Sequence, residues 1–147
     1  MDTFNIFNDE KKTAFFLGLS QKVLLLLDDD ENKSIAEKAV NCCWEWLTKR
    51  SYNGDFLYEL LVNEENGITV IAEMFEDSRS CSIWNCLIDA VAYTSRKAYE
   101  NEGARYYPEP IEMVNDDLIY HFLQCYSLCV PKDNYIERIS DFLSDCY

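Results

Sequence analysis

The chain has 147 residues, with 27 Asp and Glu against 13 Lys and Arg, so its formal net charge is −14. Because 48% of its residues are hydrophobic and 14% are aromatic, it is too apolar to be a disordered acidic tail, and its length allows a sizeable core. The excess of acids argues against direct binding to nucleic acid or to an anionic membrane, since both partners require Lys and Arg to neutralise phosphate.

The first part of the chain is expected to be helical, since only four Gly and three Pro interrupt the whole sequence. Apolar residues at helical spacing predict a first helix from about residue 9 to residue 27. The acidic run at residues 28–31 is expected to be a solvated loop, because acids at a helix C-terminus oppose the helix dipole. Ser34 and Glu37 have the spacing of a capping box and are expected to open the second helix.

Two short elements are expected next. Asp55 is a plausible N-cap for a helix over residues 56–62, after a turn at residues 52–55. Asn66-Gly67 ends that helix, and residues 68–75 are expected to form another, although their β-branched content leaves a strand open.

The second half of the chain is predicted to hold three longer helices. The first runs from about residue 79 to residue 100 and is followed by a loop of about ten residues. Asn115 or Asp116 is expected to cap the next helix, which Pro131 stops, and Asp133 is expected to cap the last one.

The expected fold is all-α. The sequence shows no internal repeat and no low-complexity linker that would divide it. We therefore expect a single compact helical domain of about six helices that spans residues 1–147.

The compartment signals favour the cytoplasm. No basic N-terminus followed by an apolar core marks a signal peptide, and the longest leucine-rich run, residues 23–27, is far shorter than the roughly 20 residues that span a bilayer. The seven cysteines are odd in number and include no Cys-x-x-Cys pair, which favours reduced thiols. They are Cys42, Cys43, Cys81, Cys86, Cys125, Cys129 and Cys146.

Negative charge is concentrated in two stretches that contain no Lys or Arg. Residues 51–78 hold seven acids and residues 106–131 hold four, and tyrosines accompany both sets. Surface charge of one sign steers an oppositely charged partner, and tyrosine is enriched at interface hot spots. A plain alternative is that the acids solvate an ordinary surface and the tyrosines fill a core.

Candidate metal chemistry centres on His121, the only histidine. His121, Cys125 and Cys129 are spaced to share one helix face, and with a fourth ligand from elsewhere they could hold zinc. A packing role is favoured, because both cysteines lie beside the apolar residues Phe122 and Tyr126.

Asp89 is the other unusual polar residue, since it interrupts the apolar run at residues 87–93. A buried carboxylate needs partners, for which Arg96, Lys22 or a tyrosine hydroxyl are the candidates. A structural role is favoured over catalysis. The sequence has no phosphate-binding glycine loop and no His-Glu-x-x-His, so we expect no cofactor, no catalytic residues and no enzymatic activity.

Four segments, in this order and spacing, resemble the immunity protein six family of bacterial polymorphic toxin systems. They are residues 14–24 (AFFLGLSQKVL), 39–47 (AVNCCWEWL), 54–58 (GDFLY) and 89–95 (DAVAYTS). The resemblance is best between residues 14 and 99. It implies a small all-helical antidote that binds a cognate toxin domain in the cytoplasm of the producing cell, without a cofactor or a reaction.

The charge agrees with such a role, because a nuclease-type toxin presents a basic cleft that would attract a protein of charge −14. The leading hypothesis is therefore an immunity protein that neutralises a basic toxin through its acidic surface. The first candidate contact patch is Tyr52, Asp55, Tyr58, Glu59, Glu64 and Glu65. The second is Tyr106, Tyr107, Glu109, Glu112, Asp116 and Asp117.

Two alternatives stay open. One is a cytoplasmic helical adaptor or regulatory protein with a partner other than a toxin. The other is an enzyme, metal-dependent or not, that uses His121 with Cys125 and Cys129 or a cluster of Glu and Asp. Under the leading hypothesis, reversing Asp55 and Glu59 to Lys is expected to slow association while changing stability by no more than about 0.5 kcal/mol.

Overall fold

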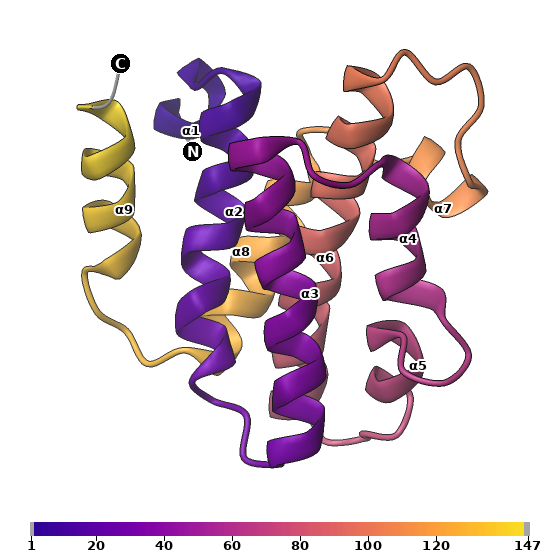
Figure 1. The fold of residues 1–147 in the computed structure, drawn as a ribbon. Coiled ribbons are helices and arrows are strands. Elements are labelled where there is room, and N and C mark those ends of the chain that lie inside the picture. The colour runs from indigo at the N-terminus through magenta and orange to yellow at the C-terminus, as the bar shows by residue number, and fades with distance from the viewer. Residues whose placement is uncertain (1, 146–147) are drawn as a thin grey trace.

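A computed structural model describes residues 2–145, and within this range the chain is built from nine α-helices with no strand (Figure 1). The helices are α1 (Asp2–Ile6), α2 (Asp9–Leu24), α3 (Asp30–Lys49), α4 (Gly54–Val62), α5 (Ile68–Ala72), α6 (Ser78–Asn101), α7 (Glu109–Glu112), α8 (Leu118–Cys129) and α9 (Tyr135–Ser144). The all-α prediction is confirmed. Residues 68–75, for which a strand was left open, contain helix α5 and no strand. The count differs from about six because α1 and α7 are too short to show helical periodicity.

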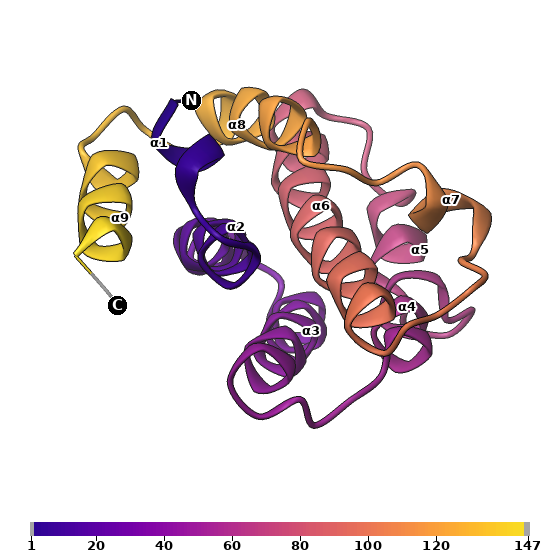
Figure 2. The same ribbon diagram turned by 90° about the horizontal axis from the view of Figure 1, so that it is seen from above.

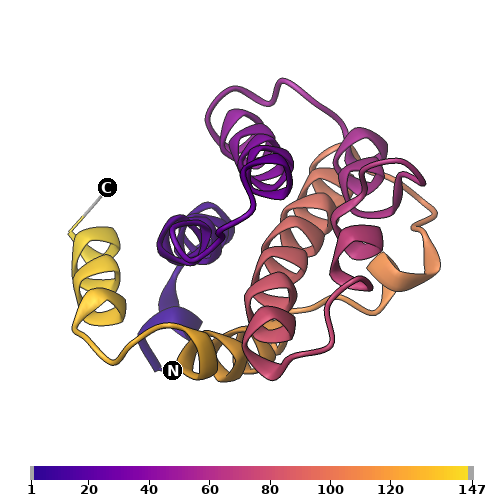
Figure 3. The same ribbon diagram turned by 90° about the horizontal axis from the view of Figure 1, so that it is seen from below.

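Helix α6 is the central element of the fold. It packs against α2, α3, α4, α5, α7 and α8, and the views from above and below show these helices arranged around it (Figures 2 and 3). Helix α9 packs mainly on α2 and lies at the edge of the molecule opposite α7 (Figures 1 and 2). Helices α4 and α7 therefore both pack on α6.

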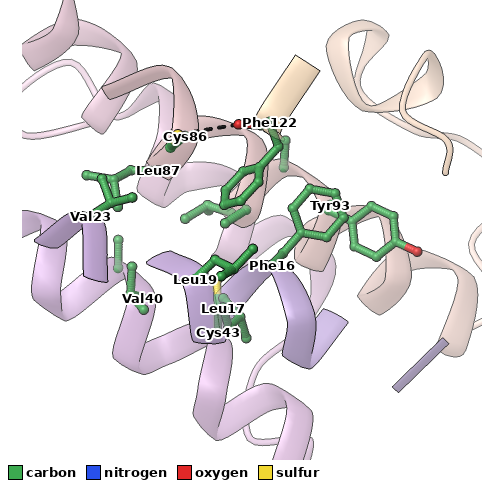
Figure 4. Packing of buried hydrophobic residues seen from close by; sticks show 14 of the residues in the cluster. Phe16, Leu17, Leu19, Val23, Val40, Cys43, Cys86, Leu87, Tyr93 and Phe122 are labelled. Atoms are coloured by element: carbon green, nitrogen blue, oxygen red, sulfur yellow. Dashed lines mark hydrogen bonds between the residues drawn. The ribbon is translucent and has the colours of Figure 1, made fainter. Parts of the chain in front are cut away.

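Aromatic rings from three helices form the centre of the core (Figure 4). The ring of Phe16 in α2 stacks on Tyr93 of α6 at 4.4 Å between centroids and lies edge-on to Phe122 of α8 at 5.1 Å. Helix α1 exists because fully buried Phe4 packs against Phe15 and Phe16 at 5.6 and 5.9 Å. The apolar stripe expected in the first helix is thus covered on more than one side.

The loop predicted at residues 28–31 is only half right, because Asp28 and Asp29 precede the helix but α3 already begins at Asp30. Asp29 is the N-cap, and its side chain accepts a hydrogen bond from the Asn32 backbone at 2.9 Å. Asp30 and Glu31 lie in the first turn, where negative charge stabilises the exposed N–H groups. Ser34 and Glu37 consequently lie inside the helix and do not form a capping box.

The N-terminal caps of three later helices can be compared with those expected from the sequence. Asn53, not Asp55, caps α4, because its side chain accepts from the Phe56 backbone at 2.8 Å. Helix α8 starts one to two residues later than expected, at Leu118. Asn134, not Asp133, is the N-cap of α9, so that prediction is off by one residue, although the Asp133 side chain accepts the backbone N–H of Tyr135 at 2.9 Å.

The six described cysteines are free thiols, as expected, and Cys146 lies outside the described residues. Five of the six are buried. Between residues 2 and 145, none of the helices is long and apolar enough to cross a membrane.

Candidate functional site

Tyr99 is the side chain at which the two acidic stretches meet. It lies near the C-terminal end of α6, and its hydroxyl donates a hydrogen bond to Oδ1 of Asp55 at 2.5 Å. Its ring lies edge-on to Tyr107 with 5.7 Å between centroids. Beside it, Oε1 of Glu102 accepts the backbone N–H of Gly54 at 2.7 Å. One residue from each predicted patch, Asp55 and Tyr107, is therefore fixed to the same end of α6 (Figure 1, upper right).

Gly54 makes this meeting point possible because α4 approaches α6 very closely there. A Cβ atom at this position would lie 2.5 Å from the Tyr99 ring. The hydroxyl of Ser95 donates to the Gly54 carbonyl at 3.1 Å and holds the two helices together. Only glycine fits this contact without displacing the ring.

Arg96 fixes the connection between α6 and α8. Its Nη1 donates to the carbonyl oxygens of Ile111 at 3.4 Å and Glu112 at 3.2 Å, and its Nε donates to Glu100 at 3.2 Å. The guanidinium also lies over the Tyr107 ring, 4.1 Å from its centroid. Residues 102–117, which we call the loop surface, are therefore held at both Tyr107 and α7.

The loop surface presents two large side chains to solvent. Tyr106 is 87% exposed and Met113 is 79% exposed, one on each side of α7. Between them, Ile111 is buried and anchors α7 to the core. Glu109 and Glu112 are exposed, and their carboxylates form no ion pair or hydrogen bond with another described side chain. The loop surface thus displays aromatic, thioether and carboxylate groups from an ordered backbone.

Asp116, also predicted as a contact residue, is engaged in an intramolecular ion pair, although 43% of its side chain is exposed. Its carboxylate lies 2.7 Å from Nζ of Lys12 and accepts the Tyr93 hydroxyl at 2.8 Å. Burial acts to raise the pKa of Asp116, but the hydrogen bonds from Lys12 and Tyr93 outweigh it and hold that pKa below its usual value. Its neighbour Asp117 remains exposed.

The first predicted patch is divided between the two ends of α4. Tyr52, at the N-terminal end, stacks on Phe56 at 4.2 Å, and Phe56 is 39% exposed. Glu64 and Glu65 are exposed in the turn after the other end, roughly 13 Å away along a nine-residue helix.

The two remaining members of that patch lie along α4. Glu59 is exposed and lines a shallow groove of about 250 Å³ between α3 and α4, together with Lys38 and Phe56. Tyr58 is half-buried and packs against the core. Only the N-terminal end of α4 is therefore continuous with the loop surface.

Comparison with known proteins decides the family. The model of the family described as "Immunity protein Imm6" matches residues 11–129. The chain belongs to the Imm6 immunity protein family. No curated protein and no solved structure gives a significant match. The matched range runs from the first turn of α2 to the last residue of α8, so the meeting point at Tyr99 and the loop surface lie within the Imm6 region, whereas α9 lies outside it.

In this Imm6 family member the partner of Asp89 is His121, and the predicted partners Arg96, Lys22 and tyrosine are wrong. Nδ1 of His121 lies 2.6 Å from Oδ2 of Asp89. The carboxylate is 8% exposed, whereas the imidazole is 50% exposed. Burial raises the pKa of Asp89 to about 6, and the hydrogen bond and charge of His121 act in the opposite direction.

Cys125 extends this pair, because its Sγ lies 3.7 Å from Nε2 of His121. An Asp, His and Cys in this order is the arrangement that activates a thiol nucleophile. Here, however, burial and the nearby charge of Asp89 raise the pKa of the Cys125 thiol, which keeps it protonated at neutral pH. The third residue of the zinc alternative, Cys129, directs its Sγ at the Tyr126 carbonyl at 3.7 Å. Among residues 2–145, no group of three or more His, Cys, Asp and Glu side chains could hold a metal ion.

Proposed function

We propose that this Imm6 family member binds a cognate basic toxin domain of the nuclease type through its acidic surface and so neutralises it. The match of the Imm6 model to residues 11–129 carries the proposal, because the members of this family are immunity proteins. The protein acts in the cytoplasm of the producing cell, as one domain of residues 1–147, and performs no reaction of its own.

Charge supports the choice of a basic partner. Eleven of the 14 excess negative charges lie in the two stretches without Lys or Arg. Such a surface attracts a cationic protein over distances of about one Debye length and raises the association rate at low salt. A nuclease that must bind a phosphate backbone offers a cationic cleft, and an acidic protein over that cleft excludes the nucleic acid.

The decisive experiment is co-expression with the toxin domain encoded beside this chain's gene. We expect cells to survive toxin induction only when the chain is present, and the purified proteins to form a stoichiometric complex. The association rate should fall steeply as the salt concentration rises from 50 to 500 mM.

Three outcomes separate the alternatives. Toxin lethality that the chain does not change, with no complex detected, would overturn the proposal. Binding without protection would favour the adaptor alternative. Protection by a complex whose association rate does not depend on salt would keep the immunity role and reject the basic partner.

A further inference from the structure

We propose that the loop surface, residues 102–117, is the principal contact with the toxin, that Tyr106 inserts into an apolar socket on a cationic toxin face, and that Arg96 positions the loop without touching the toxin. This inference rests on the proposed function. It assigns the interface to one of the two acidic stretches and adds a residue, Arg96, that belongs to neither.

The exposure of Tyr106 is the first observation behind the assignment. With 87% of its surface exposed, Tyr106 packs against no ring in the described structure, and Met113 beyond α7 is 79% exposed. Single exposed apolar residues are ordinary on a protein surface. Here, however, two of them flank a single helical turn, and tyrosine is among the residues that most often dominate binding energy.

The order of the loop is the second observation. Tyr107, the residue after Tyr106, contacts both the Tyr99 ring and the Arg96 guanidinium. Arg96 also donates hydrogen bonds to the carbonyls of Ile111 and Glu112, the last two residues of α7. Tyr106 is therefore held by its neighbours although its own side chain is free. Because the backbone on both sides is already fixed, only the Tyr106 side chain must be ordered on binding, and this lowers the entropic cost of association.

Charge is the third observation. The loop surface contains five acids and one base, Arg105. The half-exposed carboxylate of Asp116 is paired with Lys12, and the positive charge of Arg96 faces Glu100. The exposed carboxylates that remain, such as Glu109 and Glu112, make the rim of Tyr106 predominantly negative. The toxin surface that fits this rim is cationic around an apolar socket for one aromatic ring.

Binding kinetics of the wild-type chain and its variants to the isolated toxin domain test the anchor. Tyr106→Ala is expected to weaken the affinity at least about tenfold, mainly through faster dissociation. The matched control is Tyr120→Ala, since Tyr120 is 54% exposed on α8. It should change the affinity by less than about twofold.

A pair of charge reversals tests the location of the electrostatic contact. Glu109→Lys with Glu112→Lys is expected to slow association about tenfold at low salt. Glu64→Lys with Glu65→Lys makes the same change in net charge beyond the C-terminal end of α4, away from the loop surface. This pair should slow association far less. Equal effects of the two pairs would show that only net charge matters and would overturn the assignment.

The positioning role of Arg96 needs a readout that loss of stability alone would not move. Arg96→Lys keeps the charge but loses the planar fork that reaches two carbonyls and stacks on Tyr107. We expect faster amide hydrogen exchange confined to residues 106–113 and a weaker affinity. If Arg96 acts through the loop, then Arg96→Lys combined with Tyr106→Ala should bind no more weakly than Tyr106→Ala alone.

The outcomes distinguish this inference from the proposed function. A wild-type chain that neither binds nor protects removes both. A wild-type chain that binds and protects, with Tyr106→Ala and the Glu109/Glu112 reversal as tight as their controls, leaves the immunity role standing and overturns the loop surface as its interface. Full additivity of Arg96→Lys and Tyr106→Ala would overturn the positioning role.

Discussion

The hydroxyl of Tyr99 in α6 donates a 2.5 Å hydrogen bond to Asp55, the second residue of α4. Asp55 therefore has a structural role, although its sequence context is that of an ordinary surface acid. The bond also holds the start of α4 next to the loop surface. The two acidic stretches, far apart in sequence, are thereby connected by one aromatic side chain that also contacts Tyr107.

Reversing Asp55 should therefore cost more than reversing Glu59, although both are exposed acids on α4. Asp55→Lys removes the acceptor of the Tyr99 hydroxyl and is expected to lower the free energy of unfolding by about 1–2 kcal/mol, whereas Glu59→Lys should stay within about 0.5 kcal/mol. Urea denaturation measures both. If both reversals change the free energy of unfolding equally and little, the Tyr99–Asp55 hydrogen bond adds nothing to stability. That outcome is the one expected from the sequence alone, which treats both acids as ordinary surface residues.

Gly54→Ala is expected to destabilise the protein by about 2–4 kcal/mol, because the new methyl group would lie 2.5 Å from the Tyr99 ring. Gly18→Ala in α2 is the matched control, since its Cβ would meet Ile139 of α9 at an ordinary 3.4 Å. The control should be neutral or stabilising by up to about 1 kcal/mol through helix propensity. Thermal unfolding of the two variants compares them directly, and a tolerated Gly54→Ala would contradict the close approach of α4 to α6.

The start of α3 offers a test of the corrected helix boundary. Asp29→Ala removes the side chain that caps the helix and should cost about 1 kcal/mol. Ser34→Ala lies inside the helix and is expected to be neutral or slightly stabilising, because alanine is the better helix former. The reverse order of the two effects in denaturant titrations would restore the capping box at Ser34 and Glu37.

The Asp89–His121 pair predicts a pH dependence of stability with a definite sign. The folded pKa of Asp89 is about 6, above the value of about 3.8 expected for an aspartate in the unfolded chain. Between these values the unfolded chain releases the proton and the folded chain retains it, so the contribution of Asp89 is most favourable below pH 4 and is lost as the pH rises toward 6. The loss should not exceed about 3 kcal/mol.

Asp89→Asn isolates this contribution from the other 26 acids of the chain. It lacks the titrating group but keeps an acceptor for His121. The wild type should lose stability relative to Asp89→Asn as the pH rises from 4 to 6, and the difference should then level off. A difference that is flat across this range, or of the opposite slope, would contradict the assignment of the raised pKa to Asp89.

Helical periodicity was sufficient to predict the long elements, because the apolar stripes of α2, α6 and α8 recur over several turns. It could not predict α1 and α7, which span five and four residues and depend on the buried anchors Phe4 and Ile111. The boundary of α3 was predicted wrongly because an acidic run opposes the end of one helix and stabilises the start of another equally well.

The candidate surface could be predicted as two acidic stretches, but the state of each acid could not. Asp116 pairs with Lys12, which lies 104 residues away in the chain, and Asp55 bonds Tyr99, 44 residues away. No local pattern reveals such partners. The sequence suggests Arg96 only as a partner for Asp89, because a base at the border of an acidic stretch gives no sign that it binds the carbonyls of a distant turn.

The position of α9 has a practical consequence for these measurements. This helix lies beyond the Imm6 match and packs mainly on α2, at the edge of the molecule farthest from α7 (Figures 1 and 2). The C-terminal side of α9 is therefore the best place to immobilise the protein on a biosensor chip or to fuse it to a fluorescent reporter. Attached there, the protein would present residues 102–117 to the solution unobstructed, and kinetics recorded in that orientation would report on the loop itself.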